Sequence, residues 1–185
     1  FIHPFDDPHV IAGQGTVALE MLAEKPDFDT LVVPIGGGGL IAGMAIAAKG
    51  INPNISIVGV EASMYAGMLA ELEGREVKVG GATIAEGIAV RDVGRLPLQV
   101  ARELVDEIVL VEEEHLERAI TLFVNVEKTI AEGAGAAGLA ALLAHPEKFK
   151  GKKVGLVLCG GNIDTRLLAS VLTRALVREK RLPSI

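Results

Sequence analysis

The stretch with the clearest chemical potential is a run of four glycines, Gly36–Gly39. It follows the apolar, mostly β-branched run Leu31–Val33, which predicts a buried strand, and it leads into the small apolar run Leu40–Lys49, which predicts a helix. Glycines at a helix N-terminus let backbone N–H groups approach an anion closely, and the helix dipole favours negative charge there. The pattern therefore predicts a phosphate-binding turn.

The same turn also permits a nucleotide. Gly37, Gly39 and Ala42 fit the spacing G-x-G-x-x-G/A, and Glu61 ends the next predicted strand. A dinucleotide-binding fold places a ribose-binding carboxylate at about that point. The glycines alone therefore do not separate a phosphorylated cofactor from a nucleotide.

A second strand, glycine turn and helix lie near the end of the chain. Lys153–Leu158 predicts the strand, Cys159–Asn162 the turn, and Asp164 the N-cap of the helix. In an open parallel sheet, ligands bind outside the carboxyl ends of the strands, so we expect both turns to face one ligand. The glycine-rich stretch Glu132–Gly138 places a carboxylate beside backbone that a neighbouring helix or a planar ligand can approach closely.

The predicted elements alternate between strand and helix. Strands are expected at residues 31–33, 56–61, 107–111 and 153–158, and helices at 13–23, 40–49, 66–72, 98–104, 113–131, from 132 to about 145, and from 164. Thr16 is expected to cap the first helix, and Asp6 and Asp7 are expected to be turn residues between prolines. The alternation predicts right-handed βαβ units. We expect an α/β fold, with an open, mostly parallel twisted sheet and helices on both faces.

Composition narrows the class of protein. The 185 residues are 50% hydrophobic and 3% aromatic, which suits a single domain with closely packed helices. The net charge of −6 is spread along the chain and argues against nucleic acid or an anionic membrane as a partner. The single cysteine, Cys159, excludes a disulfide within the chain, and no apolar run reaches the roughly 20 residues that span a membrane. We therefore expect a cytoplasmic location.

Several motifs, in order along almost the whole chain, resemble the threonine/serine dehydratases. This pyridoxal-phosphate-dependent family also contains serine racemase and the tryptophan synthase β subunit. The motifs that carry the resemblance are His3-Pro4-Phe5-Asp6-Asp7-Pro8, Val10-Ile11-Ala12-Gly13-Gln14-Gly15-Thr16, the four glycines, Ala85-Glu86-Gly87 and Cys159-Gly160-Gly161-Asn162-Ile163-Asp164. The resemblance implies the large-domain portion of a PLP fold type II enzyme.

The resemblance also implies a set of residues that bind pyridoxal 5'-phosphate. The backbone that would cradle the phosphate belongs to Gly36, Gly37, Gly38, Gly39 and Leu40. Cys159 takes the position of the residue that contacts the pyridine nitrogen, and Asn162 follows in the same turn. Gly87 would lie beside the ring, and Glu132 would lie near the cofactor.

The activity implied by the resemblance is β-elimination from a hydroxy amino acid. L-Threonine would give 2-oxobutanoate and ammonia, as in isoleucine biosynthesis, and L-serine would give pyruvate and ammonia. Alternatives within the family are a serine racemase and a hydroxyaspartate dehydratase. From another class, the alternative is a non-catalytic nucleotide-binding module. Enzymes of this kind are expected to be homo-oligomers, dimers or tetramers.

One part of the family pattern does not occur in this sequence. The Schiff-base lysine of the family lies in an S-F-K-x-R-G-A-like motif and the substrate loop in an S-x-G-N-H-like motif, both upstream of the matched region. None of the nine lysines lies in that context. We therefore expect residues 1–185 to be the C-terminal, cofactor-binding part of a two-domain enzyme, inactive by itself and partnered by the N-terminal part.

Relatives such as serine racemase bind a divalent cation beside the strand that ends here at Glu61. Glu61 is therefore a candidate metal ligand, and Tyr65 could offer a carbonyl oxygen. Gly67 stands where a second carboxylate is expected. The simpler alternative for Glu61 is a carboxylate that only ends a strand.

Overall fold

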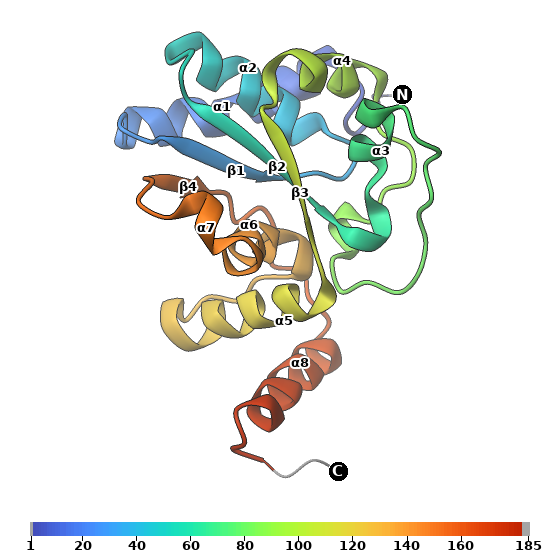
Figure 1. Ribbon diagram of the computed structural model, residues 1–185, viewed down its shortest axis with the longest axis vertical. Helices are drawn as coiled ribbons and strands as arrows, with labels where there is room; N and C mark the ends of the chain where they lie inside the picture. The colour runs from blue at the N-terminus through green and yellow to red at the C-terminus, as the bar shows by residue number, and fades with distance from the viewer. Residues whose placement is uncertain (1, 183–185) are drawn as a thin grey trace.

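The computed structural model describes residues 2–182, so Phe1 and the last three residues lie outside the described range. A sheet of four strands forms its centre, and every pair of neighbouring strands is parallel (Figure 1). The strand order is β3 (Glu107–Val111), β2 (Ser56–Ala62), β1 (Thr30–Pro34), β4 (Val154–Leu156). The expected α/β fold with a parallel sheet is confirmed.

Helices cover both faces of the sheet (Figure 1). One face packs against α1 (Pro8–Glu24), α2 (Gly39–Ile51), α3 (Gly67–Glu73) and α4 (Arg95–Leu104). On the other face lie α5 (Glu113–Leu122), α6 (Gly133–Ala144) and α7 (Pro146–Phe149), whereas α8 (Thr165–Arg178) packs against α5 on the side away from the sheet. Short single turns, η1 (Ser63–Tyr65), η2 (Glu86–Ile88) and η3 (Phe123–Glu127), lie in the connections.

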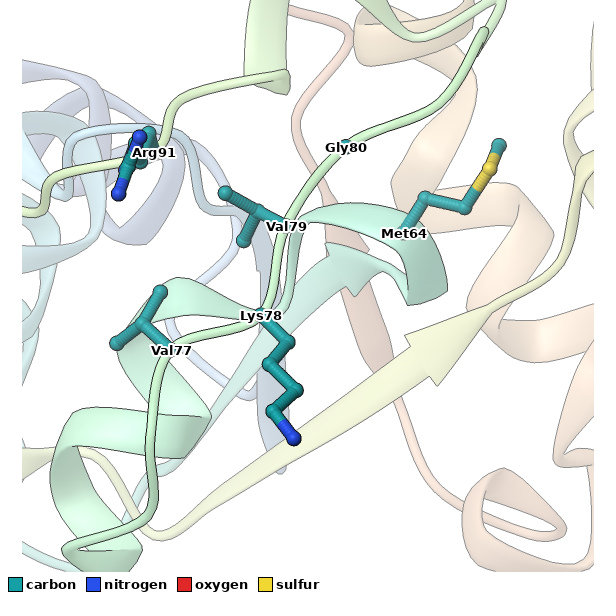
Figure 2. Close-up of a pocket in the computed structure, with 6 residues that line it drawn as sticks. All are labelled: Met64, Val77, Lys78, Val79, Gly80 and Arg91. Atoms are coloured by element: carbon teal, nitrogen blue, oxygen red, sulfur yellow. The ribbon is translucent and has the colours of Figure 1, made fainter.

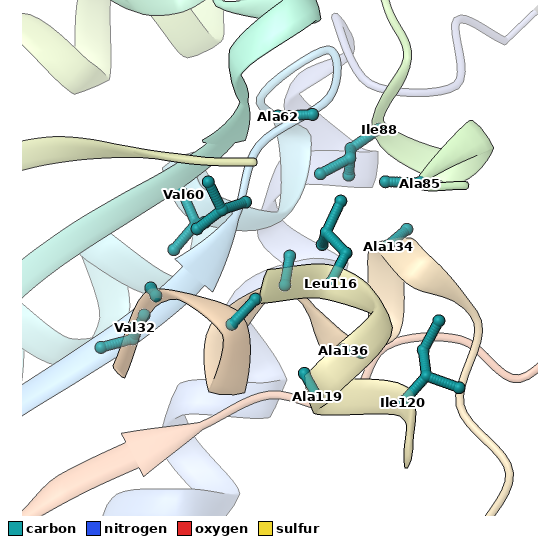
Figure 3. Packing of buried hydrophobic residues seen from close by; sticks show 14 of the residues in the cluster. Val32, Val60, Ala62, Ala85, Ile88, Leu116, Ala119, Ile120, Ala134 and Ala136 are labelled. Carbon is teal, nitrogen blue, oxygen red and sulfur yellow. The ribbon is translucent and has the colours of Figure 1, made fainter. Parts of the chain in front are cut away.

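The core between the sheet and α5 and α6 uses small side chains on the helix side. Figure 3 shows Val32 and Val60 of the sheet facing Leu116 of α5 and Ala136 of α6. Ala136 and Leu116 are fully buried. Because alanine occupies little space, the α6 backbone comes close to the strands, and its N-terminus is held near the edge where the strands end.

The first helix begins earlier than the sequence predicts. Asp7, not Thr16, is its N-cap, because the Asp7 carboxylate accepts from the His9 N–H at 2.8 Å and from the Val10 N–H at 3.3 Å. Pro8 at the first helical position is compatible with this start. Thr16 instead bonds through its hydroxyl to the Gly13 carbonyl within the helix. Gly13 and Gly15, which resemble a helix start in the sequence, lie inside α1, and Gly15 serves the close contact with Gly43 of α2.

Other boundaries differ as well. The helix predicted for 113–131 ends at Leu122 and continues as the wider turn η3, and Lys128 then adopts a left-handed φ of 55°. The helix predicted from residue 98 begins at Arg95, and α7 was not predicted. The final strand covers three residues instead of the predicted six.

Glu61, at the end of β2, is a buried cap for α3. Its side chain accepts from the Met68 N–H at 2.7 Å and from the Leu69 N–H at 3.0 Å, and the residue is only 1% exposed. Burial raises the pKa of Glu61 to about 7, although hydrogen bonds from the backbone of Leu69, Met68 and Gly67 oppose this shift. The carboxylate therefore ties β2 to the helix that follows it.

α1 and α2 cross closely at Gly43, and the stability of variants at this crossing tests the contact. A Cβ at Gly43 would overlap the Ile11 carbonyl oxygen, which is backbone and cannot move aside. A Cβ at Gly13 of α1 or at Gly50 of α2 would meet nothing within 4 Å. We expect Gly43→Ala to lower the free energy of unfolding by about 1–3 kcal/mol, whereas Gly13→Ala and Gly50→Ala raise it by about 0.5–1 kcal/mol. Urea unfolding of the three variants measures these changes in the free energy of unfolding. Equal changes at all three positions would show that the close crossing does not require glycine at position 43.

The raised pKa of Glu61 generates a prediction about pH. The folded chain holds this proton more tightly than the unfolded chain, whose carboxyl has the ordinary value of 4.5. The stabilisation is therefore complete below pH 4.5 and is lost as the pH rises through about 7. Relative to Glu61→Gln, the wild type should lose up to about 3 kcal/mol of unfolding free energy over this range.

Urea unfolding of both proteins at several pH values measures that difference. The pKa values of Asp7 and Asp27 are lowered, by backbone hydrogen bonds and by the hydrogen bond from Lys153 respectively, and their effect on stability has the opposite sign. These groups are present in both proteins and cancel in the comparison. A difference that stays constant with pH would contradict the prediction.

Candidate functional site

The two glycine turns lie at the same edge of the sheet. β1 pairs with β4 in parallel, with Thr30 opposite Val154 and Val32 opposite Leu156. The segments that leave the two strands, Gly36–Gly39 and Cys159–Asn162, therefore begin side by side at the carboxyl edge. The expected position of both turns at one edge is confirmed, and their facing one ligand stays a prediction.

The first turn presents a row of N–H groups without protein acceptors. Within the described part of the chain, no hydrogen bond uses the N–H groups of residues 36–40, although Gly37, Gly38 and Gly39 are buried. The preceding Ile35 N–H donates to Val60, and the helix ladder begins only with Ala42. Buried N–H groups almost always have a partner, so this row fits an anion such as a phosphate group.

Contacts within the protein shape this turn. Gly38 is the N-cap of α2 with a left-handed φ of 93°, which glycine adopts without strain. A Cβ at Gly36 would lie 3.1 Å from the Val90 side chain and 3.3 Å from the Gly87 carbonyl oxygen. The turn therefore touches η2 on one side, and this contact brings Gly87 next to the predicted phosphate site.

Glu132 lies between η2 and the second turn. Its N–H donates to the Gly160 carbonyl at 3.1 Å, and a Cβ at Gly160 would overlap its carboxylate. A Cβ at Gly87 would lie 3.5 Å from the same carboxylate. Gly36, Gly87, Glu132 and Gly160 therefore form a continuous series of contacts around the edge.

Cys159 lies in the second turn and is exposed. Its sulfur lies 3.8 Å from the Ala134 carbonyl oxygen of α6 and donates a hydrogen bond to it. Desolvation by the protein atoms around the sulfur raises the pKa of the thiol, and the charge of Glu132 raises it further. The thiol therefore stays protonated at neutral pH.

The remaining predicted residues occupy the borders of the site. Leu40 is half-buried in the first turn of α2, and Asn162 is exposed three residues after Cys159. The structure thus brings Gly36–Gly39, Gly87, Glu132 and Cys159 together at one edge. Their role in binding a cofactor stays a prediction.

Sequence reasoning missed the residue that supports Gly87. Glu113, in the first turn of α5, accepts from the Thr83 hydroxyl at 2.5 Å and from the Ile84 N–H at 2.9 Å. These bonds fix the loop that leads into η2. The sequence showed Glu113 only as an acidic residue at a helix N-terminus, so its distant partners gave no signal.

Glu61 does not join this site. Because its carboxylate is buried and bonded to the N-terminus of α3, the nucleotide alternative loses its ribose-binding group. In the described range, no group of three or more His, Cys, Asp or Glu side chains is arranged to hold a metal ion. A divalent cation at Glu61 stays a prediction, and the observed contacts assign the carboxylate to helix capping.

A separate open hollow of about 480 Å³ lies beside η1 (Figure 2). The hollow is lined by Met64, Val77, Lys78, Val79, Gly80 and Arg91. Its two cations have acidic neighbours, Glu76 at 3.3 Å from Lys78 and Asp92 at 3.9 Å from Arg91. It contains none of the predicted site residues.

Comparison with known proteins supports the resemblance noted in the sequence. An L-threonine ammonia-lyase of Thermotoga maritima is 45% identical over 183 residues, which are 98% of this chain and 45% of that protein. Threonine deaminase isoform 2 of Solanum lycopersicum, in its processed form, superposes with a TM-score of 0.87 and 38% identity, over 95% of this chain and 50% of that one. Maize serine racemase superposes with a TM-score of 0.83 and 36% identity, over 94% of this chain and 56% of that one.

The chain spans about half the length of the curated relatives it matches. The family model described as "Pyridoxal-phosphate dependent enzyme" matches residues 1–160, which include the first glycine turn, Gly87, Glu132 and the start of the second turn at Cys159 and Gly160. This match covers most of the chain and agrees with the unpartnered N–H groups of the first turn. The chain therefore belongs to the pyridoxal-phosphate-dependent enzyme family.

Proposed function

We propose that this chain is the cofactor-binding part of a pyridoxal-phosphate-dependent ammonia-lyase acting on L-threonine or L-serine. The products are 2-oxobutanoate or pyruvate, together with ammonia. The observation that carries the proposal is the row of N–H groups at residues 36–40 without acceptors, beside the turn that holds Cys159. Relatives named L-threonine ammonia-lyase, 45% and 46% identical to this chain, support the choice of reaction.

The residues at the edge fit the two ends of the cofactor. The N–H groups of Gly36–Leu40 and the positive end of the α2 dipole would hold the phosphate dianion. Cys159 would face the pyridine ring as a neutral thiol, with Gly87 and Glu132 at the border of the ring. When bound, pyridoxal phosphate supplies the electron sink for chemistry at the α-carbon of an amino acid.

The neutral thiol has a chemical consequence. A carboxylate beside the ring nitrogen would favour a proton on that nitrogen, whereas a protonated thiol does not. Burial, and to a smaller extent the charge of Glu132, keep the proton on the Cys159 sulfur. This environment favours departure of a β-hydroxyl group over reactions that need a long-lived carbanion.

We also propose that a further polypeptide part, the N-terminal part of the same enzyme, carries the cofactor-bearing lysine. The edge of β4 supports this proposal. Thr30 opposes Val154, and the Thr30 N–H bonds to the carbonyl of Lys153, so the N–H and C=O groups of Val154 point to the outer side. No hydrogen bond in the described range fills that outer side at Val154 or Leu156, and the side chain of Leu158 beyond them is 40% exposed.

The opposite edge of the sheet, formed by β3, is less open than the β4 edge. The His145 ring bonds to the Leu110 carbonyl of β3 at 3.0 Å, and Glu107 at the start of β3 pairs with Lys148. Charged and capped edges resist the addition of a strand, whereas open edges accept one. The β4 edge, next to Cys159, is therefore where we place the lysine-bearing part.

The proposal for cell location comes from the composition, and the proposal for assembly comes from the resemblance. We propose a cytoplasmic homo-oligomer of two or four copies. No helix among residues 2–182 is both long and apolar enough to cross a membrane. A hollow of about 510 Å³ between α1, α2 and α4, with Leu19 and Ile46 nearly half exposed, is consistent with a contact between copies.

The proposal is tested by combining this chain with a lysine-bearing part. Co-expression with the remaining segment of the Thermotoga maritima relative should give a protein that releases 2-oxo acid and ammonia from L-threonine or L-serine, while this chain alone releases none. Parallel assays with 3-hydroxyaspartate, and chiral analysis for D-serine, separate the hydroxyaspartate dehydratase and racemase alternatives. Nucleotide binding without affinity for pyridoxal phosphate would overturn the proposal.

Replacement of Cys159 tests the role of the neutral group. Cys159→Ser keeps a protonated donor and should change kcat for threonine by less than about threefold. Cys159→Asp introduces a carboxylate and should lower kcat at least about tenfold, which corresponds to about 1.4 kcal/mol. Cofactor content, measured by absorbance, serves as the control, because both variants should retain it. An aspartate variant with wild-type kcat would show that the proton at this position does not matter.

A further inference from the structure

The segment His3–Asp7 packs directly on the phosphate-binding turn. A Cβ at Gly37 would overlap the ring of Phe5. A Cβ at Gly39 would lie 3.0 Å from the Phe5 Cβ and 3.2 Å from its carbonyl oxygen. Contact with Phe5 therefore requires glycine at two of the four positions, Gly37 and Gly39. Cofactor binding alone does not account for glycine at these two positions.

The Phe5 ring is itself held in place. The His3 ring packs against it edge-on, with 4.6 Å between the ring centroids, and His3 Nδ1 accepts from the Asp6 N–H at 3.0 Å. The Asp6 carboxylate accepts from the Leu96 N–H at 2.8 Å, which fixes the segment to α4. Asp7 caps α1 immediately afterwards. Phe5 is thus anchored from both sides along the chain.

The remaining sides of the turn are already in contact with other elements. Val90 packs against Gly36, Met68 and Pro97 pack against Gly38, and the Gly37 carbonyl accepts from the Gly94 N–H at 2.9 Å. Phe5 supplies the contact at Gly37 and Gly39. An apolar ring cannot bind a phosphate group, so any effect of Phe5 on binding must act through the backbone of the turn.

We propose that Phe5 is a positioning residue, which holds the turn in the conformation that directs the N–H groups of Gly36–Leu40 toward the cofactor phosphate. This inference rests on the proposed function, because it takes the cofactor phosphate as the guest of the turn. Phe5 lies about thirty residues before the turn in the sequence. Its side chain has no polar group, so it would influence cofactor binding only through the shape of the turn. The ring acts by packing, because a change in one side chain of a closely packed interior displaces its neighbours.

The test compares binding of pyridoxal 5'-phosphate and of pyridoxal, which lacks the phosphate, by equilibrium dialysis of the co-expressed protein. Phe5→Ala should weaken binding of pyridoxal phosphate at least tenfold and change binding of pyridoxal less than twofold. Phe5→Leu should recover most of the loss. Phe28→Ala is the matched control, because Phe28 is also half-buried but lies against Gly155, the middle residue of β4, and away from the turn. It should leave the ratio of the two affinities unchanged.

A second pair of variants tests the contact itself. Gly37→Ala should weaken binding of pyridoxal phosphate because its methyl group meets the Phe5 ring. The double variant Gly37→Ala with Phe5→Ala should bind better than Gly37→Ala alone, since the smaller side chain makes room. Independent losses in the double variant, or equal losses for both ligands in Phe5→Ala, would overturn the positioning role.

A readout without ligand separates this inference from the proposed function. The amide resonances of Gly36–Gly39 should shift in Phe5→Ala and stay in place in Phe28→Ala. If they shift but the wild type binds no pyridoxal phosphate, the proposed function fails while the packing role of Phe5 stands. Unchanged resonances in Phe5→Ala would overturn the inference even where the protein binds its cofactor.

Discussion

The parallel pairing of β1 with β4 is the constraint on which the site depends. Parallel neighbours end at the same edge of a sheet, so the segments that leave them meet although they are far apart in the sequence. Pro34, the last residue of β1, has no N–H to extend the ladder, and the chain turns away into Gly36–Gly39. An antiparallel β4 would send Cys159 to the opposite edge and leave the glycine turn without its second wall.

The N-terminus of α6 joins the loop before Gly87 to the second turn. A Cβ at Gly133 would overlap the Ile84 carbonyl, and one at Gly135 would overlap the Gly160 carbonyl. These small residues therefore let one helix touch both the loop before Gly87 and the turn after Cys159. The close approach serves packing between protein segments, and it sets the distance between Gly87 and the Cys159 turn. Bulk at either glycine would push one wall outward.

The sequence predicted the α/β architecture well, because a buried strand has a recognisable local pattern of apolar residues. The runs Leu31–Val33 and Ile57–Val60 are apolar and bounded by turns, and each became a strand. The predicted glycine turn and the shared edge also agree with the structure. Helix ends were less predictable, because Gly15 lies inside α1 for a reason, the crossing with Gly43, that no local pattern reveals.

The same distinction applies to the site. Gly36–Gly39, Gly87, Glu132 and Cys159 were identified from local motifs, and the fold brings them together. The supports of the site, Phe5 and Glu113, were not identified because their partners lie far away in the sequence. Glu61 shows the converse. Its position at a strand end suggested a ligand, whereas in the fold both of its oxygens accept hydrogen bonds from α3.

The charges at the edge of the sheet also favour one orientation of the ligand. The chain carries a net charge of −6, so attraction for a phosphate must come from backbone dipoles, and these lie at the start of α2. At the other wall, burial raises the pKa of the Cys159 thiol, and the charge of the Glu132 carboxylate raises it further. Under the proposed function, a reversed cofactor would place its dianionic phosphate beside Glu132 and would leave the N–H groups of Gly36–Leu40 without that phosphate. The positive field at the start of α2 and the negative charge of Glu132 would therefore favour one orientation of the ligand, and the same carboxylate adds to the effect of burial that keeps the thiol neutral.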